Sequence, residues 1–212
     1  MNIRSIVGGV AVSALLMSAP ALAVDTVNES ITPQHFATIF GPTLPPVGYV
    51  QFCAASPAEC RQKSFAVKTL ELTPERWRDV YQVNTLVNAK IRPVSDMELY
   101  GRAEVWTLPR DAGDCEDYLL LKKKYLEAMG FPASALLITV VLDERQEGHA
   151  VLTLASRDGD YVLDNRRNDI LRWNITGYTF LKRQSNSNPK KWVALIGQSP
   201  VASAEISATR TP

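Results

Sequence analysis

The sequence predicts an α+β protein, in which helices occupy the first half of the chain and an antiparallel sheet the second. Two observations predict this class. Amphipathic helical patterns precede residue 130, and short β-branched apolar runs separated by turn residues follow it. The chain of 212 residues is 46% hydrophobic and 21% charged, which suits one well-buried domain. Its formal net charge of +1 gives no reason to expect a nucleic acid or an anionic membrane as partner.

The first 23 residues have the pattern of a secretory signal peptide. A basic start is followed by an apolar run over residues 6–17 and by small residues around a cleavage site at Ala23. The apolar run is too short to span a membrane, so we expect cleavage and a periplasmic protein with no membrane insertion afterwards. A single domain is expected over residues 24–197, and the small, polar tail at 198–212 is expected to be disordered.

The first part of the mature chain carries one strong helix signal. Residues 24–50 contain several prolines and little periodicity, which predicts extended or loop structure. Thr73 and Pro74 are typical of an N-cap and a first helical residue, and the amphipathic pattern behind them continues to about Ile91. A short helical turn is expected at residues 96–100.

A second helix is predicted to begin at Cys115, where a polar connector ends. Apolar residues at helical spacing define one of its faces, carboxylates fill its first turn, and Gly130 ends it. The expected apolar face consists of Tyr118, Leu121, Tyr125 and Met129. A thiol in the first turn feels the positive end of the helix, which favours the thiolate. A small buried hydrophobic residue is the alternative for Cys115.

Beyond residue 130 the pattern changes to that of strands. Strands are expected at residues 135–142, 149–154, 161–164, 178–183 and 191–196. Arg157 and Asp158, followed by Gly159, predict the hairpin turn between the second and third of them.

The three cysteines divide into a pair and a single residue. Cys53 and Cys60 bracket a short loop that contains a proline, so a local disulfide is expected in an oxidising compartment. Cys115 is then left unpaired, and an unpaired thiol in an exported protein suggests a functional role.

A histidine and an aspartate complete a candidate catalytic set with Cys115. Cysteine hydrolases need a thiolate, an imidazole that shares its proton, and a group that orients the imidazole. A two-residue turn at Arg157 and Asp158 would place Asp164 diagonally across from His149 on one face of the hairpin. A bulge at Gly159 would instead turn Asp164 to the other face, and the sequence leaves both registers open.

Together these stretches resemble the bacterial transglutaminase-like cysteine proteinases. The likeness rests on the GDCEDY run at residues 113–118, on the strand opened by His149 and on the VLDN run at residues 162–165. The Cys53/Cys60 pair, residues 84–101 and the segment around Trp192 extend it to residues 40–197.

The resemblance implies a papain-like or transglutaminase-like core with Cys115 as nucleophile, His149 as base and Asp164 as the residue that orients the imidazole. It also implies a periplasmic protease that clips a large biofilm adhesin, controlled by an inner-membrane regulatory receptor. Asp114 and Glu116 fall at the positions that the family uses for calcium.

The residues themselves offer a second argument for calcium. Carboxylates at Asp114, Glu116 and Asp117 would crowd negative charge around Cys115 and oppose formation of the thiolate, and a bound Ca²⁺ would neutralise them. In the alternative, Asp114 caps the helix and the other two acids are solvated. The interpretation is therefore an exported cysteine endopeptidase. Two alternatives stay open: acyl transfer of the transglutaminase type, and a binding module with a vestigial triad.

Overall fold

The computed structural model describes residues 34–61 and 70–195. The expected signal peptide and the expected disordered tail lie outside these residues, so the predicted domain bounds remain a prediction. Within the part of the chain that is described, no helix is long and apolar enough to cross a membrane.

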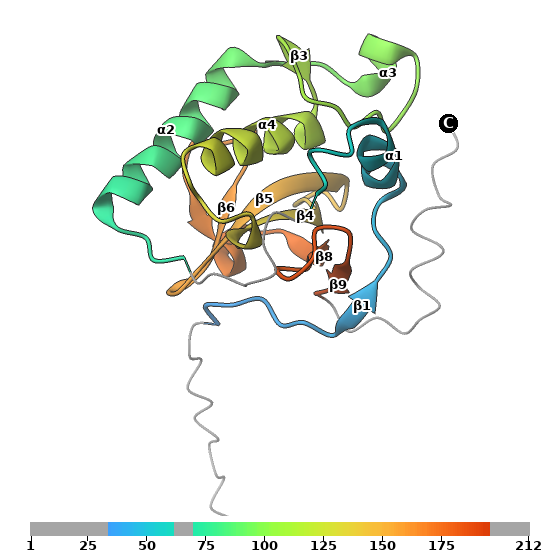
Figure 1. The fold of residues 1–212 in the computed structure, drawn as a ribbon. Coiled ribbons are helices and arrows are strands. Elements are labelled where there is room, and N and C mark those ends of the chain that lie inside the picture. The colour runs from blue at the N-terminus through green and yellow to red at the C-terminus, as the bar shows by residue number, and fades with distance from the viewer. Residues whose placement is uncertain (1–33, 62–69, 196–212) are drawn as a thin grey trace, which may run out of the picture. The chain divides into compact units, whose positions relative to one another are not determined.

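Among the described residues, seven strands form one sheet in which every neighbouring pair is antiparallel (Figure 1). The strands are β1 (Gly41–Thr43), β4 (Leu136–Leu142), β5 (Gly148–Ser156), β6 (Gly159–Leu163), β7 (Leu171–Arg172), β8 (Thr179–Gln184) and β9 (Trp192–Ala194), and their order is β1-β9-β8-β4-β5-β6-β7. The predicted antiparallel sheet is confirmed, while the short strands β1 and β7 were not predicted. The central strand β4 is buried along most of its length, which explains its continuous apolar sequence.

The described part of the chain has four helices, of which the longer ones lie over one face of this sheet (Figure 1). The four helices are α1 (Val47–Ala55), α2 (Pro74–Lys90), α3 (Asp96–Tyr100) and α4 (Cys115–Ala128), with single 3₁₀ turns at Ala133–Ala135 and Trp173–Ile175. The predicted start of α2 is confirmed, because the Thr73 hydroxyl accepts a hydrogen bond from the Arg76 amide at 3.3 Å. The short strand β2 (Arg92–Pro93) follows α2. It pairs in parallel with β3 (Ala112–Gly113), which lies just before α4.

Helix α4 begins at Cys115 as predicted, ends at Ala128 shortly before the predicted stop at Gly130, and is buried on more than one face. It lies between α2 and the sheet (Figure 1), so Leu119 and Leu120 are buried together with the predicted Tyr118 and Leu121. Met129, which was expected on the apolar face, is exposed because the helix has already ended at Ala128.

Extended or loop structure was predicted for residues 24–50, which agrees with the extended β1 but is wrong from Val47 onward, where α1 begins. Helix α1 is hard to recognise because Pro46 stands at its N-cap position without a side-chain cap and its sequence lacks an amphipathic pattern. Its Gly48 allows a close approach of two segments: a Cβ at this position would lie 2.3 Å from Cδ1 of the buried Trp106 ring.

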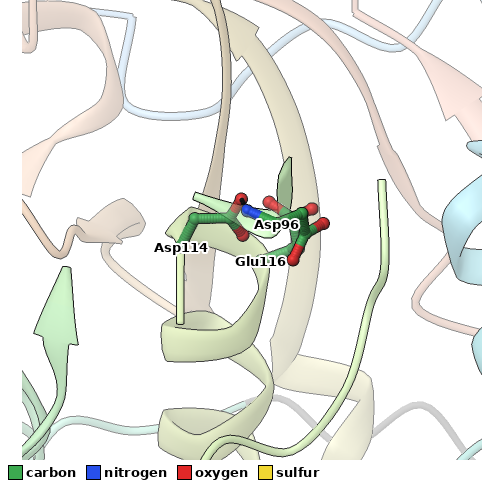
Figure 2. A group of neighbouring side chains, drawn as sticks. All are labelled: Asp96, Asp114 and Glu116. Carbon is green, nitrogen blue, oxygen red and sulfur yellow. Dashed lines mark hydrogen bonds between the residues drawn. The ribbon is translucent and has the colours of Figure 1, made fainter. Parts of the chain in front are cut away.

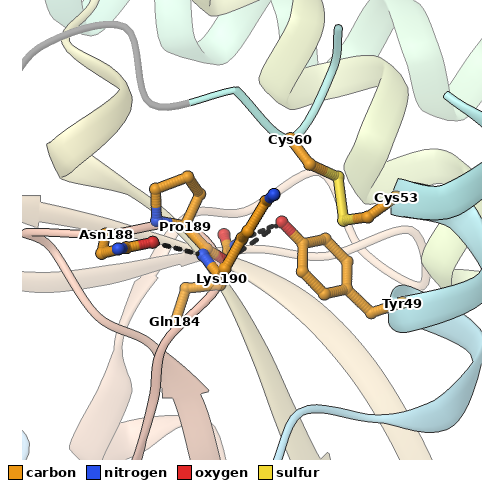
Figure 3. The surroundings of a disulfide bond; sticks show 7 residues. All are labelled: Tyr49, Cys53, Cys60, Gln184, Asn188, Pro189 and Lys190. Atoms are coloured by element: carbon orange, nitrogen blue, oxygen red, sulfur yellow. Dashed lines mark hydrogen bonds between the residues drawn. A yellow bond between two sulfur atoms is a disulfide. The ribbon is translucent and has the colours of Figure 1, made fainter. Parts of the chain in front are cut away.

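The predicted disulfide is confirmed and joins α1 to the loop behind it. Cys53 and Cys60 are bonded (Figure 3), and closure of so short a loop contributes about 2–3 kcal/mol through the unfolded state. Beside it, Tyr49 donates to the carbonyl of Pro189 at 3.1 Å and accepts from Gln184 at 2.7 Å. These contacts fix α1 against the β8–β9 hairpin.

Candidate active site

The sulfur of Cys115 lies at the N-terminus of α4, against the first residues of β5. The backbone amide of Ala150, the residue that follows His149, is near enough to lower the pKa of this thiol. The thiol in turn donates to Oε2 of Glu116 at 3.0 Å. Cys115 is partly buried and is the one cysteine outside the disulfide. The structure thus places the candidate nucleophile beside the strand that carries the candidate base.

The surroundings of Cys115 oppose the thiolate. Burial raises the pKa of its thiol well above the usual value, and the charges of Glu116 and Asp114 raise it further. The amide of Ala150 acts in the opposite direction with a smaller effect. The helix N-terminus alone therefore does not activate this cysteine.

The β5–β6 hairpin brings His149 and Asp164 together. Ser156 pairs with Gly159 and Leu152 with Leu163, so the turn has two residues, as one of the two predicted registers requires. Nε2 of His149 and Oδ1 of Asp164 are 3.0 Å apart, and the two residues are 3% and 1% exposed. Because Asp164 engages Nε2, Nδ1 is the nitrogen that can exchange a proton with another group.

Asp164 is held as a charged acceptor. Burial alone would raise its pKa, but hydrogen bonds from His149, from the Tyr178 hydroxyl at 2.6 Å and from the Arg166 amide at 3.0 Å lower the pKa to about 2. The Tyr178 ring also meets the His149 ring edge to face, with centroids 5.7 Å apart. Tyr178 was not predicted, since only the fold brings this residue, which directly precedes β8, beside the pair.

Asp114 and Glu116 gather with a third carboxylate, that of Asp96 (Figure 2). Each offers an oxygen, and these three oxygens lie within 4.8 Å of one another. Asp114 stands at the N-cap position of α4 but makes no capping bond, and its Oδ2 instead accepts from the Asp96 amide at 3.3 Å. Asp96 was not predicted as a site residue. It lies in the first turn of α3, where an acid is also ordinary helix chemistry, so no sequence signal distinguished it.

Asp117 does not belong to this group, and the charges that raise the pKa of Cys115 are those of Glu116 and Asp114 rather than that of Asp117. Its Oδ1 accepts from the Thr107 amide at 2.9 Å, so it fixes the connector before α4. Gly113 leaves room for it, because a Cβ there would lie 2.4 Å from Oδ2 of Asp117. Burial raises the pKa of Asp117 to about 8.

Lys122 is an unusual residue of α4, two turns beyond Cys115. Its side chain is 0% exposed, and no residue in the described ranges provides a hydrogen-bond partner for Nζ. Burial lowers the pKa of Lys122 to about 7, although the negative charge of Asp164 acts in the opposite direction and raises it. An ammonium group in this position costs stability, since the unfolded chain solvates it fully.

We predict that Lys122→Met stabilises the fold, by about 3 kcal/mol at pH 6 once relaxation around the buried charge is allowed for. Between about pH 7 and the ordinary lysine pKa of 10.5, the unfolded state of the natural protein binds more protons than the folded state, so its stability rises with pH. The gain from Lys122→Met therefore shrinks at alkaline pH. Urea unfolding at pH 6 and pH 9.5 measures it, with the exposed Lys190→Met as control. An equal gain at both pH values would contradict the prediction.

An α+β fold with a cysteine at a helix N-terminus and a buried His–Asp pair on the facing sheet is the architecture of papain-like and transglutaminase-like cysteine peptidases. The bacterial transglutaminase-like cysteine proteinase family matches residues 39–199, and the chain belongs to this family. It is a cysteine peptidase that acts on protein substrates, and the predicted fold class is confirmed.

Three solved structures of LapG from Legionella pneumophila are similar to this chain. The EGTA-treated form is 23% identical with a TM-score of 0.48, covering 56% of this chain and 67% of LapG. The calcium-bound form is 21% identical with a TM-score of 0.49, covering 62% and 80%. A third LapG structure is 20% identical with a TM-score of 0.48, covering 62% and 75%. No curated protein sequence matches the chain.

Proposed function

We propose that this chain is a periplasmic cysteine endopeptidase that hydrolyses a peptide bond in a cell-surface or periplasmic protein through Cys115, His149 and Asp164. The observation that carries the proposal is the buried His149–Asp164 contact of 3.0 Å, at the start of the strand whose next residue, Ala150, acts electrostatically on the Cys115 thiol. The family resemblance favours a large adhesin as substrate and an inner-membrane receptor as regulator.

In the proposed reaction, His149 accepts the thiol proton of Cys115 at Nδ1, and the sulfur attacks the carbonyl carbon of the scissile peptide. The imidazolium then donates its proton to the leaving amine, which leaves a thioester on Cys115. His149 next takes a proton from water, which attacks the thioester; the C–S bond breaks, the acid fragment leaves, and the imidazolium returns its proton to the Cys115 thiolate. Asp164 keeps the ring oriented through Nε2 and stabilises its positive charge at each proton transfer.

The acidic cluster of Asp96, Asp114 and Glu116 fits a Ca²⁺ ion. Two oxygens bound to one Ca²⁺ lie at most about 5 Å apart, because Ca–O distances are about 2.3–2.6 Å. Oδ1 of Asp96 and Oδ1 of Asp114 are buried and have no hydrogen-bond donor among the described residues, although a buried carboxylate oxygen normally has one. Burial and the neighbouring Asp114 raise the pKa of Glu116 well above its usual range, so the cluster holds more negative charge than it can stabilise.

When bound, Ca²⁺ would supply the positive charge that offsets these carboxylates near Cys115. Glu116 has two roles in this arrangement, since it also accepts the thiol hydrogen bond. We therefore propose that the protease is calcium-dependent, with Asp96, Asp114 and Glu116 as the protein ligands.

We expect cleavage of internally quenched peptides to need Ca²⁺ and to stop with EGTA. Calorimetry should detect Ca²⁺ binding to the natural protein, and Asp96→Asn should weaken it at least about tenfold. Alkylation of Cys115 at pH 7 should become faster when Ca²⁺ is added, because the thiol pKa falls.

The exposed Asp111→Asn, three residues before Asp114, is the matched control and should leave cleavage, Ca²⁺ binding and the alkylation rate unchanged. Peptide cleavage that continues in EGTA would contradict the calcium dependence. Failure to cleave any peptide or protein with Ca²⁺ present would contradict the proposed endopeptidase function.

A further inference from the structure

The loop that follows β6 is held from α2 by two asparagine side chains, although α2 carries none of the proposed catalytic groups. Nδ2 of Asn88 donates to the carbonyl of Asp164 at 2.9 Å and to the carbonyl of Arg167 at 3.0 Å. Nδ2 of Asn84 donates to the carbonyls of Arg167 at 3.3 Å and Asn168 at 3.0 Å. Both side chains thus bind main chain of the segment that begins with Asp164.

The helix geometry makes this contact possible. Asn84 and Asn88 are four residues apart, so they project from the same face of α2, one turn above the other. Asn84 is 0% exposed and Asn88 is partly buried. A side-chain amide offers two N–H donors, which suits carbonyls that have left the hydrogen-bond ladder of a sheet. Apolar residues at these positions would pack in a buried interface equally well. Packing alone therefore does not explain why both residues are asparagines.

Other contacts hold this loop by its side chains. Arg166 binds Oδ2 of Asp143, in the β4–β5 turn, at 2.6 Å, and the Tyr178 hydroxyl binds Oδ2 of Asp164 at 2.6 Å. The asparagine contacts differ from these side-chain contacts because they are made to the main chain, and Asn88 binds the carbonyl of Asp164 itself. Its bond fixes the backbone from which the carboxylate reaches His149.

We propose that Asn84 and Asn88 are positioning residues for catalysis, which set the place of the Asp164 carboxylate and, through it, the orientation of the His149 ring. This inference rests on the proposed function of Cys115, His149 and Asp164. It adds helix α2 to the elements that the chemistry requires. Errors of about 1 Å in the placement of a catalytic group can cost on the order of 100-fold in rate.

The test uses Asn88→Leu, which keeps the size of the side chain and removes its donors. We expect kcat on internally quenched peptides to fall on the order of 10- to 100-fold with KM nearly unchanged, because the substrate does not contact α2 in this proposal. We also expect the downfield proton resonance of the His149–Asp164 hydrogen bond to shift or broaden. With only two histidines in the chain, a His35→Gln variant assigns that resonance.

Val87→Ala is the matched control. Val87 is 0% exposed and adjacent to Asn88, so its truncation loosens the packing of α2 without removing a bond to the loop. It should lower the melting temperature and leave both kcat and the resonance unchanged. If Asn88→Leu does not fold, Asn88→Ser replaces it in the same measurements.

A folded Asn88→Leu protein with the natural kcat and resonance would overturn the inference, as would an equal loss of kcat in Val87→Ala. The proposed function fails separately, if the natural protein cleaves nothing. In that case the His149 resonance of Asn88→Leu still reports whether the asparagines set the His149–Asp164 contact.

Discussion

Cys115→Ala is expected to abolish cleavage, with a loss in kcat of at least about 10³-fold and no loss of the fold. The reaction proposed here has no acyl-enzyme without this sulfur, and removal of a nucleophile leaves only the contribution of binding to catalysis. The side chain is small and partly buried, so its truncation removes few contacts and circular dichroism should be unchanged. Mass spectrometry of peptides after incubation with the natural and the variant protein measures the effect.

The same experiment separates the alternatives to hydrolysis. Cys53 and Cys60 are joined in the disulfide, so iodoacetamide should label Cys115 alone and inactivate the protein. Hydrolysis gives two fragments whose masses add up to the substrate and one water, whereas acyl transfer to an added amine gives a heavier adduct. Undiminished cleavage by Cys115→Ala would contradict the proposed nucleophile, and binding without any turnover by the natural protein would indicate a vestigial site.

Asp164→Ala is expected to lower kcat on the order of 10³- to 10⁴-fold, since it frees the His149 ring and removes the charge that stabilises the imidazolium. The low pKa of Asp164, about 2, keeps its carboxylate ionised, so the carboxylate's contribution to stability is full above about pH 4 and is lost as pH falls through 2. Titration of Asp164 should therefore not limit the activity at any pH above about 4. A pH profile of kcat between pH 4 and pH 9 measures this.

Asp160→Asn controls for the loss of a buried acid from β6. Asp160 accepts from Arg183 at 2.7 Å and from the Ala37 amide at 3.0 Å, and it has no contact with His149. This variant should be destabilised and yet keep its kcat. If Asp160→Asn and Asp164→Ala lost kcat equally, the role proposed for Asp164 would be wrong.

The part of the fold that depends on periodicity and caps was predictable. Helices α2 and α4 have strong boundary residues, such as Thr73 and Gly130, and the central strands have apolar runs that only a sheet buries so completely. Helix α1 was missed because it lacks both signals. The two-residue strands β2 and β3 were missed because so short a pairing depends on tertiary contacts rather than on the pattern of either segment.

Site residues were predictable from the sequence where they lie in one local segment of the chain. The unpaired Cys115 and the hairpin between His149 and Asp164 could be located from spacing, but the register that puts these two side chains together was one of two that the sequence left open. Asp96 and Tyr178 could not, because each comes from a distant segment and carries an ordinary residue type for its element. Asp117 was placed near Cys115 because it is close in sequence, but the helix turns its carboxylate toward the Thr107 amide.

The β2–β3 pair links the two chain segments that supply the acidic cluster, one leading to Asp96 and the other to Asp114 and Glu116. Pro93 pairs with Gly113, and the Val94 amide donates to the Gly113 carbonyl at 3.0 Å. Asp96 opens α3 shortly after β2, and Asp114 directly follows β3. The first turn of the nucleophile's helix and the first turn of α3 thus share one short double-stranded support. Protection of the Val94 amide from hydrogen exchange would therefore measure how firmly these two helix starts are held together, without the need for an activity assay.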